Sequence, residues 1–417
     1  MRFENVYTPE QERAREALRK EVRELIKAKG KGVSGGPVDD RTISRDLLKR
    51  NKEFRIELGK KGWFMPTMPK KYGGAGLSPD MASVIYDELD VLNEWAADGF
   101  PGGVGPTSFV PNDHSTGMVG ILNKIGTEEQ KDRMLPPLVR GELVTWEVFT
   151  EPEAGSDLPS LQTTAVRDGD EYVINGHKMW IGGNNAPPDV LMTLAITDPN
   201  APRHRNISVF LIPCNIPGVH IYPIDCLAPP YKNQIIFEDA RFPASCAVGE
   251  GGDGWVAFNT RGGDGGREGE RRRPIDELID YSKETIRNGQ RLSQDPEVQE
   301  IVTKAYVDNE IHRLLGLRNR WMAEQNRAGT AKKRTTYEGG QMTVYNKQLG
   351  PRNADALLKA WGPVALIANE PWGPMRGAAE MYHRHAIEQT HPGGTIEINK
   401  LRMFRSVIGP GTRIPAS

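Results

Sequence analysis

The segment best suited to bind a ligand covers residues 150–157 and reads Thr-Glu-Pro-Glu-Ala-Gly-Ser-Asp. It offers two hydroxyls, at Thr150 and Ser156, and backbone N–H groups left accessible by Gly155. Asp157 can fix the loop through an Asx-turn. This chemistry suits the polar edge of a ring or a phosphate-bearing ligand, and an ordinary capped hairpin loop would show the same composition.

A second candidate is the segment 176–183, where Gly-His-Lys-Met-Trp-Ile-Gly-Gly ends a predicted strand. Trp180 stands just before Gly182 and Gly183, so its indole could stack on a planar ligand at the end of the strand. The alternative is an ordinary core tryptophan. Composition alone leaves these alternatives open for both segments.

Three blocks of sequence must position these segments. Residues 1–142 carry apolar side chains at helical spacing, and Thr8 and Gln11 form a predicted capping box for the first helix. Further helices in this block are expected over 45–63, 79–95 and 115–137.

The second block, residues 143–250, alternates short β-branched and aromatic runs with turn residues. This pattern predicts a small antiparallel barrel or sandwich, with hairpin turns at 168–170 and 175–176. The third block, residues 251–417, begins with a glycine-rich stretch and then turns helical. Its helices are expected over 277–288, 296–329, 343–362 and 376–388.

Composition excludes several classes of protein. The chain of 417 residues has 54 basic and 55 acidic side chains, and this net charge of −1 gives no reason to bind nucleic acid or an anionic membrane. No apolar run approaches the roughly 20 residues of a spanning helix, and the N-terminal residues lack the apolar core of a signal peptide, so we expect a cytoplasmic protein without membrane insertion. The three cysteines and eight histidines lack metal-ligand spacing, so no metal site is expected.

The order of residues in both candidate segments resembles the flavin-binding strands of the acyl-CoA dehydrogenase family. The family hallmark Thr-Glu-Pro-x-Ala-Gly-Ser-Asp is matched at 150–157 without a gap. The family segment Gly-x-Lys-x-Trp-Ile is matched by Gly176, Lys178, Trp180 and Ile181. Other family features follow in the same order along the chain, at 69–76, 126–141, 237–243 and 254–255.

This resemblance implies an α+β multidomain fold. It consists of an N-terminal α-helical domain (1–142), a middle β-barrel domain (143–250) and a C-terminal α-helical bundle (251–417), whose helices also build an oligomer interface. In that family FAD lies between the β-domain and the C-terminal helices, and a neighbouring subunit completes its pocket.

Several residues acquire expected roles from the resemblance. The residues assigned to FAD are Val148, Phe149, Thr150, Trp180, Ile181, Gly182 and Arg287. The backbone of the first three would face the isoalloxazine edge, and the indole would lie against the ring. The family usually has Thr or Ser at the position of Gly182, so the contact near flavin N5 is weaker here. Arg287 and Arg291 are candidates for reaching the pyrophosphate of the partner subunit's FAD, and Ser156 would lie near the pantetheine or phosphate part of a CoA ester.

The family reaction removes the α-proton of an acyl-CoA while FAD accepts the β-hydride, and this requires a carboxylate base. Most members carry the glutamate near the C-terminus, where this chain has Gly393. Members acting on bulky, branched or steroid chains carry it shortly after a Gly-Trp pair, and the matching window 255–266 contains no glutamate. Asp264 is the best substitute, with Glu268 and Glu270 beyond it, and the alternative is a solvated loop carboxylate.

A basic cluster follows this window and could contact CoA or FAD phosphates, or could be a solvated surface. Its members are Arg267, Arg271, Arg272 and Arg273.

The resemblance therefore predicts an FAD-dependent acyl-CoA dehydrogenase-like oxidoreductase that dehydrogenates a CoA thioester at its α,β bond. Bulky, branched or steroid-type acyl chains are among the candidate substrates. The implied partners are an acyl-CoA, an electron-transfer flavoprotein or similar acceptor, and further subunits in a homo-oligomer (dimer or tetramer) or a complex with a related chain. Two alternatives stay open: a non-catalytic partner subunit of a heteromeric enzyme, and a flavin monooxygenase of the same fold, which needs no α-proton base.

Overall fold

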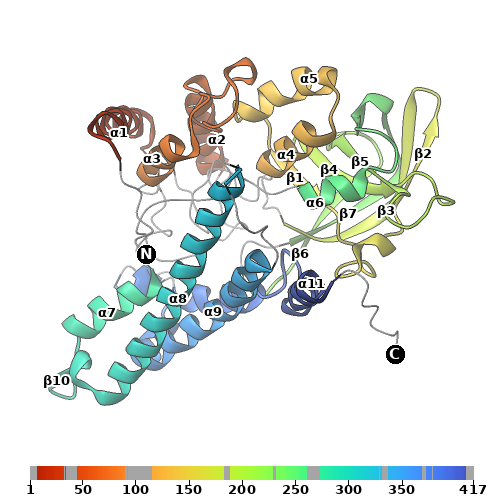
Figure 1. Ribbon diagram of the computed structural model, residues 1–417. Coiled ribbons are helices and arrows are strands. Elements are labelled where there is room, and N and C mark those ends of the chain that lie inside the picture. The colour runs from red at the N-terminus through yellow and green to blue at the C-terminus, as the bar shows by residue number, and fades with distance from the viewer. Residues whose placement is uncertain are drawn as a thin grey trace. The chain divides into compact units, whose positions relative to one another are not determined.

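The computed structural model describes residues 7–31, 33, 45–89, 92, 115–182, 188–228, 232–260, 273–327, 329–330, 337–368, 372–377 and 379–409. Along these residues the elements come in the predicted order of helices, strands and helices (Figure 1). The chain divides into two compact units. The N-terminal unit holds the first helices, the main sheet and α6 (Gly254–Thr260), and the C-terminal unit holds the helices from residue 273 onward. Within this described part of the chain, no helix is long and apolar enough to cross a membrane.

The helices before the sheet agree with the sequence prediction except at one break. They are α1 (Pro9–Lys29), α2 (Arg45–Lys60), η1 (Lys70–Tyr72), α3 (Pro79–Leu89), α4 (Ser115–Ile125) and α5 (Glu128–Val139). The single helix expected over 115–137 is wrong, because the chain starts a new helix at Thr127. The Thr127 hydroxyl accepts the backbone N–H of Gln130 at 3.2 Å, and the Gln130 side chain accepts the backbone N–H of Thr127 at 3.1 Å. This capping box ends one helix and begins the next.

The middle of the chain forms one curved sheet. Its strands are β1 (Thr145–Val148), β2 (Thr164–Asp168), β3 (Glu171–Gly182), β4 (Val190–Ile196), β5 (Ile207–Pro213), β6 (Val219–Ile224), β7 (Lys232–Pro243) and β8 (Ala247–Val248). The order is β6-β7-β3-β2-β4-β5-β8, with β1 paired to β4. Side chains of β1, β4 and β5 share one apolar core with side chains of β3 and β7, so the sheet curls over its own interior.

Of the two predicted hairpin turns, one is confirmed and one is wrong. Gly169, with a φ of 60°, lies in the turn between β2 and β3. Asn175 and Gly176 lie inside β3 at a bulge. Asn175 exchanges hydrogen bonds of 2.9 and 2.8 Å with Asp239 on β7, and a Cβ added to Gly176 would come within 2.2 Å of the Thr163 hydroxyl. Asn175 therefore stabilises a β-bulge, and Gly176 allows Thr163 to pack closely against β3; neither residue forms a turn.

Helices cover one outer face of the sheet. Figure 1 shows α4, α5 and α6 beside β1, β4 and β5. Met192 and Leu194 of β4 and Val209 of β5 are buried in one core with Leu122 of α4 and Leu135 of α5. This shared core explains why the first helices and the sheet form a single compact unit.

The C-terminal unit is built around α9. Its elements are α7 (Pro274–Glu284), β9 (Ile286–Arg287), β10 (Gln290–Arg291), η5 (Leu292–Gln294), α8 (Pro296–Arg327), α9 (Glu338–Trp361), η6 (Gly362–Leu366), η7 (Pro374–Gly377), α10 (Ala379–Glu388) and α11 (Ile396–Ile408). Helices α8, α10 and α11 all contact α9, and a buried hydrogen bond of 2.9 Å joins Asn309 of α8 to Asn353 of α9. The sequence predicts α7 to α10, but the helix expected over 277–288 is wrong at its end, because α7 stops at Glu284 and β9 follows. The sequence does not predict α11, which begins where the Thr395 hydroxyl accepts the backbone N–H of Ile398 at 3.2 Å.

Candidate functional site

The predicted ligand-binding loop follows β1 directly. After Val148 the chain turns tightly, with the Glu151 N–H donating to Ala154 O at 3.1 Å and the Ala154 N–H donating to Glu151 O at 3.2 Å. The loop lies beside the end of β3, where the Met179 N–H donates to Thr150 O at 2.8 Å. The structure therefore brings the two candidate segments together.

A buried ion pair joins the same two segments. Lys178 on β3 is fully buried, and its Nζ donates to Glu151 Oε1 at 2.7 Å, to Phe149 O at 3.2 Å and to Leu194 O at 2.7 Å. Three acceptors match the three N–H bonds of an ammonium group. The Lys178 side chain therefore ties β3 to the loop after β1 and to β4.

The pair also shifts the pKa values of both members. Burial lowers the pKa of Lys178 to about 8, against the opposing effect of the Glu151 charge. Burial alone would raise the pKa of Glu151, but the charge and hydrogen bond of Lys178 outweigh it and lower that pKa. Backbone N–H groups of Gln162 and Thr163 add hydrogen bonds of 2.6 and 3.1 Å to the carboxylate. Both groups are therefore charged at neutral pH.

Trp180 is half-exposed at a bulge, so the core-tryptophan alternative is wrong. The residue is 53% exposed and has a φ of 60°, which is rare for a bulky side chain. The β3–β7 pairing shifts here, with Lys178 opposite Ile235 and Ile181 opposite Asn233. Because of the extra residue, Lys178 and Ile181 are both buried while the indole is exposed. Strained backbone of this kind gathers at binding and active sites.

The neighbouring candidates offer backbone rather than side chains. Val148 is buried in the sheet interior, and Phe149 is buried in the core shared with the helices, where its ring meets that of Phe258 on α6 edge-on at 5.9 Å. Ile181 is buried, and Gly182 ends β3 with partial exposure. Val148 and Phe149 can therefore face a ligand only through their backbone.

Ser156 is exposed on the loop. Next to it, the Asp157 carboxylate pairs with the guanidinium of Arg203, which lies in the connection between β4 and β5. His204 follows with a φ of 74° and stacks on Trp255 of α6, with the ring centres 4.7 Å apart. A cationic group thus contacts the loop that carries Ser156, and the next residue along the chain, His204, belongs to an aromatic pair.

The two candidate arginines of the C-terminal unit make helix-end contacts. Arg287 on β9 donates from Nη2 to Ala360 O at 3.0 Å and to Trp361 O at 2.8 Å, at the carboxyl end of α9. Arg291 on β10 donates to Lys283 O at 2.9 Å, near the end of α7. Cations at these positions stabilise the negative end of a helix dipole.

Most candidates for the base and the phosphate cluster lie outside the described residues. They are Asp264, Arg267, Glu268, Glu270, Arg271 and Arg272. Arg273 is described and forms ion pairs with Asp276 at 2.9 Å and with Glu310 at 2.6 Å, which raise the pKa of its guanidinium. The charge of Arg273 is therefore neutralised by carboxylates of the C-terminal unit.

A buried lysine anchors the loop just before Gly393, the residue expected in place of the usual base. Lys347 on α9 donates to Gln389 O at 3.2 Å, to Thr390 O at 3.2 Å and to Pro392 O at 2.5 Å. Burial lowers the pKa of Lys347. Gly393 follows with a φ of 74°, and a Cβ added there would meet no atom of the described residues within 4 Å. The loop is thus anchored before Gly393 and open around it.

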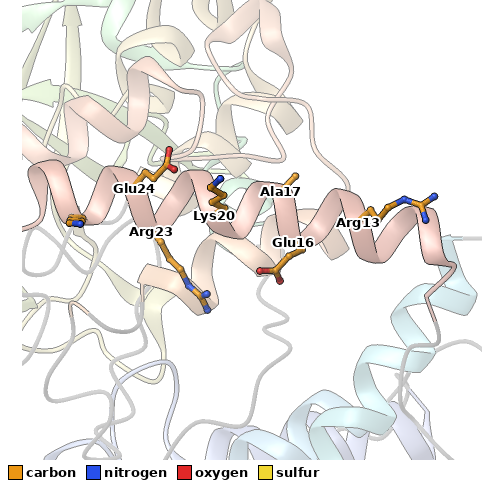
Figure 2. Close-up of a pocket in the computed structure, with 7 residues that line it drawn as sticks. Arg13, Glu16, Ala17, Lys20, Arg23 and Glu24 are labelled. Atoms are coloured by element: carbon orange, nitrogen blue, oxygen red, sulfur yellow. The ribbon is translucent and has the colours of Figure 1, made fainter.

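A surface hollow of about 450 Å³ lies along α1 (Figure 2). All of its lining residues come from this helix, and they are Arg13, Glu16, Ala17, Lys20, Arg23, Glu24 and Lys27. Arg23 is paired with Glu88 of α3 at 2.6 Å. Since charges of both signs alternate on a single helix and no second element contributes, this hollow is a solvated helix face.

Comparison with known proteins identifies the family. Three family models match the chain: the acyl-CoA dehydrogenase N-terminal domain over residues 8–142, the middle domain over 147–230 and the C-terminal domain over 266–408. Acyl-CoA dehydrogenase FadE26 of Mycobacterium tuberculosis is 28% identical over 404 residues, covering 94% of this chain and 95% of that protein. The probable acyl-CoA dehydrogenase YngJ of Bacillus subtilis is 34% identical over 297 residues, covering 69% of this chain and 74% of that protein.

Solved structures agree with this result. The ChsE4–ChsE5 complex from Mycobacterium tuberculosis has a TM-score of 0.74 at 26% identity, with 100% of both chains covered. The Tcur3481–Tcur3483 steroid ACAD has a TM-score of 0.76 at 26% identity, also with 100% of both chains covered. The family models and the named relatives define the class of protein, a flavoprotein oxidoreductase acting on CH–CH groups. The chain belongs to the acyl-CoA dehydrogenase family.

Proposed function

We propose that this chain uses FAD to dehydrogenate the α,β bond of a CoA thioester with a bulky, branched or steroid-type acyl chain. The observation that carries the proposal is the strained bulge at Trp180, which holds an indole outward beside Thr150. A planar isoalloxazine ring fits this arrangement, because it can stack on the indole and meet backbone groups at its edge. FAD supplies the acceptor for the β-hydride when it is bound.

The residues of this chain would hold cofactor and substrate in separate ways. The backbone from Val148 to Thr150 would contact the edge of the ring, and Trp180, Ile181 and Gly182 would form the wall at the end of β3. Arg287 would reach the pyrophosphate of an FAD in the neighbouring subunit, in addition to its contacts with α9.

The CoA part of the substrate would bind at the loop after β1. Ser156 is exposed there, and a phosphate would compete with Asp157 for the exposed Arg203 guanidinium next to it. A test is the affinity for CoA and for dephospho-CoA in wild type and in Ser156→Ala. The proposal predicts weaker binding of CoA by the variant, with FAD binding unchanged.

The glycine in place of the usual base supports the proposal that the substrate has a bulky acyl chain. Gly393 stands where most of the family has a glutamate and is exposed, and we propose that a larger acyl group is tolerated at this position. The Tcur3481–Tcur3483 relative is a steroid ACAD. We assign proton abstraction to Asp264, with Glu268 and Glu270 as the next candidates.

The chain would work as an oligomer. Val307, Ile311, Leu314 and Trp321 are exposed on α8 at helical spacing and form an apolar stripe. We propose that this stripe packs against a second copy or a related chain, as two-chain complexes exist among the relatives. Electrons would leave to an electron-transfer flavoprotein or similar acceptor. Three free cysteines are consistent with the reducing cytoplasm, where we place the protein.

The deciding experiment is anaerobic reduction of the FAD-loaded protein by acyl-CoAs from short-chain to steroid-sized. The proposal expects the flavin absorbance to bleach with large substrates faster than with short ones. A second candidate, a non-catalytic partner subunit, is favoured by the glycine at position 393. It expects no bleaching by the chain alone and bleaching after a related chain is added. If the purified protein binds no FAD, either alone or with the related chain, both candidate functions are contradicted.

A further inference from the structure

We propose that the buried Glu151–Lys178 ion pair positions Trp180, and that it thereby controls how tightly and in what environment FAD is held. The inference rests on the assignment of Trp180 to the cofactor made above. Neither charged group is available to touch a ligand, because Lys178 is fully buried and Glu151 is 5% exposed. They would act through the backbone that surrounds them.

The first step is the location of the pair beneath the candidate site. Lys178 Nζ donates to Phe149 O, in the strand end expected to face the ring, at 3.2 Å. The next residue of each segment continues the contact, because the Met179 N–H donates to Thr150 O at 2.8 Å. Two consecutive hydrogen bonds therefore fix the end of β3 to the loop after β1, and one of them comes from the ion pair.

The second step is the direction of the Lys178 side chain. Side chains alternate along a strand, so an inward residue 178 would place residue 180 inward as well. The bulge between Lys178 and Ile181 breaks this alternation and exposes the indole of Trp180. Three hydrogen bonds, to Glu151, Phe149 and Leu194, hold Lys178 inward. The anchored lysine thus fixes the pairing of Lys178 with Ile235, the last regular pair before the bulge.

The third step is that Glu151 extends the anchor to another element. Its two carboxylate oxygens accept the backbone N–H groups of Gln162 and Thr163 at 2.6 and 3.1 Å, just before β2 begins. The pair therefore connects the loop after β1 with β2, β3 and β4. Loss of the pair would release the end of β3 that carries Trp180, while the rest of the sheet keeps its own hydrogen-bond pairing.

The test replaces both members at once, because removing one partner would leave an uncompensated buried charge. Lys178→Met/Glu151→Gln keeps side chains of similar size without the charges. Trp180→Phe serves as the reference for loss of the indole. Phe242→Leu serves as a control for lost stability, since Phe242 is buried opposite Tyr172 on the same strand pair, roughly 25 Å along β3 at about 3.3 Å per residue.

Three quantities are measured for each variant: far-UV circular dichroism of the FAD-free protein, the dissociation constant of FAD, and the visible circular dichroism of the bound flavin. We expect the double variant to fold and to bind FAD roughly tenfold more weakly or worse, the effect that positioning partners have at metal sites. Its flavin spectrum should change in the direction of Trp180→Phe, while Phe242→Leu should keep the wild-type spectrum. A merely structural role would not move the flavin spectrum.

Two results would overturn the inference. One is a folded double variant with wild-type FAD affinity and flavin spectrum, measured beside a Trp180→Phe variant whose spectrum is altered. The other is a Trp180→Phe variant with an unchanged flavin spectrum, which would remove the indole from the ring and leave FAD dependence intact. If the double variant fails to fold, Glu151→Gln is measured at pH 9, above the Lys178 pKa of about 8, where no uncompensated charge is buried and an acceptor for Lys178 remains; it should show a smaller change of the same sign. The absence of that change would also overturn the inference.

Discussion

Placing a carboxylate at Gly393 tests whether this chain lacks the usual catalytic base. The glycine has a φ of 74°, and within the described part of the chain an added Cβ would meet no atom closer than 4 Å. Steric room is therefore available, and the cost is limited to holding an L-residue in the left-handed region, about 1–2 kcal/mol. Gly393→Ala carries the same backbone cost without the carboxylate, so it is the matched control for Gly393→Glu.

Both variants should lose about 1–2 kcal/mol of the free energy of unfolding, measured by urea denaturation. A positioned base contributes roughly 10²–10⁴-fold to proton abstraction. Anaerobic flavin reduction by an acyl-CoA should therefore be faster in Gly393→Glu than in Gly393→Ala, by up to this factor. Equal reduction rates in two folded, FAD-loaded variants would refute the reasoning about the base. A glutamate variant at least ~3 kcal/mol less stable than the alanine variant would refute the reasoning about open space.

Three further predictions concern the alternative base, a buried charge and the subunit contact. Asp264→Asn should slow flavin reduction roughly 10²–10⁴-fold with FAD still bound; an unchanged rate in stopped-flow bleaching would exclude Asp264 as the base. Burial lowers the pKa of Lys178 from 10.5 to about 8, so the unfolded chain binds more protons between these values. The stability of wild type relative to Lys178→Met/Glu151→Gln should therefore rise from pH 8 to pH 10.5 in urea unfolding, and a fall would contradict this pKa direction. Leu314→Glu in the exposed stripe of α8 should shift the protein to smaller species in analytical ultracentrifugation, whereas Lys359→Glu, an exposed substitution on α9 and so outside the stripe, should not.

Much of the fold follows from local patterns in the sequence. Apolar periodicity gives the order of helices, strands and helices, since each period marks the buried face of its own element. The break before α5 was missed although its signal, a threonine followed three residues later by glutamine at Thr127 and Gln130, is present in the sequence. The hairpin assigned to Asn175 failed because the same residue type also suits a bulge, and only the partner Asp239 on β7 decides between them.

The candidate site was predictable in its segments but not in its interior. The motif order shows that the loop after β1 and the end of β3 belong together, and the structure places them in contact. The ion pair beneath them was not predicted, because lysine and glutamate are normally exposed and a strand pattern does not show where a bulge changes the inward face. The only sequence signal is that Lys178 and Ile181, three positions apart, would need to share a face of the strand. The role of Lys347 in holding the loop before Gly393 has no local signal, since its acceptors are backbone carbonyls more than forty residues away.

At the candidate site a residue with strained backbone, Trp180, lies two positions after a residue held by hydrogen bonds, Lys178. Holding Trp180 at a φ of 60° costs about 1–3 kcal/mol. Lys178 makes three hydrogen bonds that fix its side chain inward, and its lowered pKa means that the buried charge is held at a cost in stability rather than at a gain. The indole is therefore held outward by the protein itself rather than by whatever binds there. A planar ligand would meet a surface that is already in place, and little of its binding energy would be used to order this part of the strand.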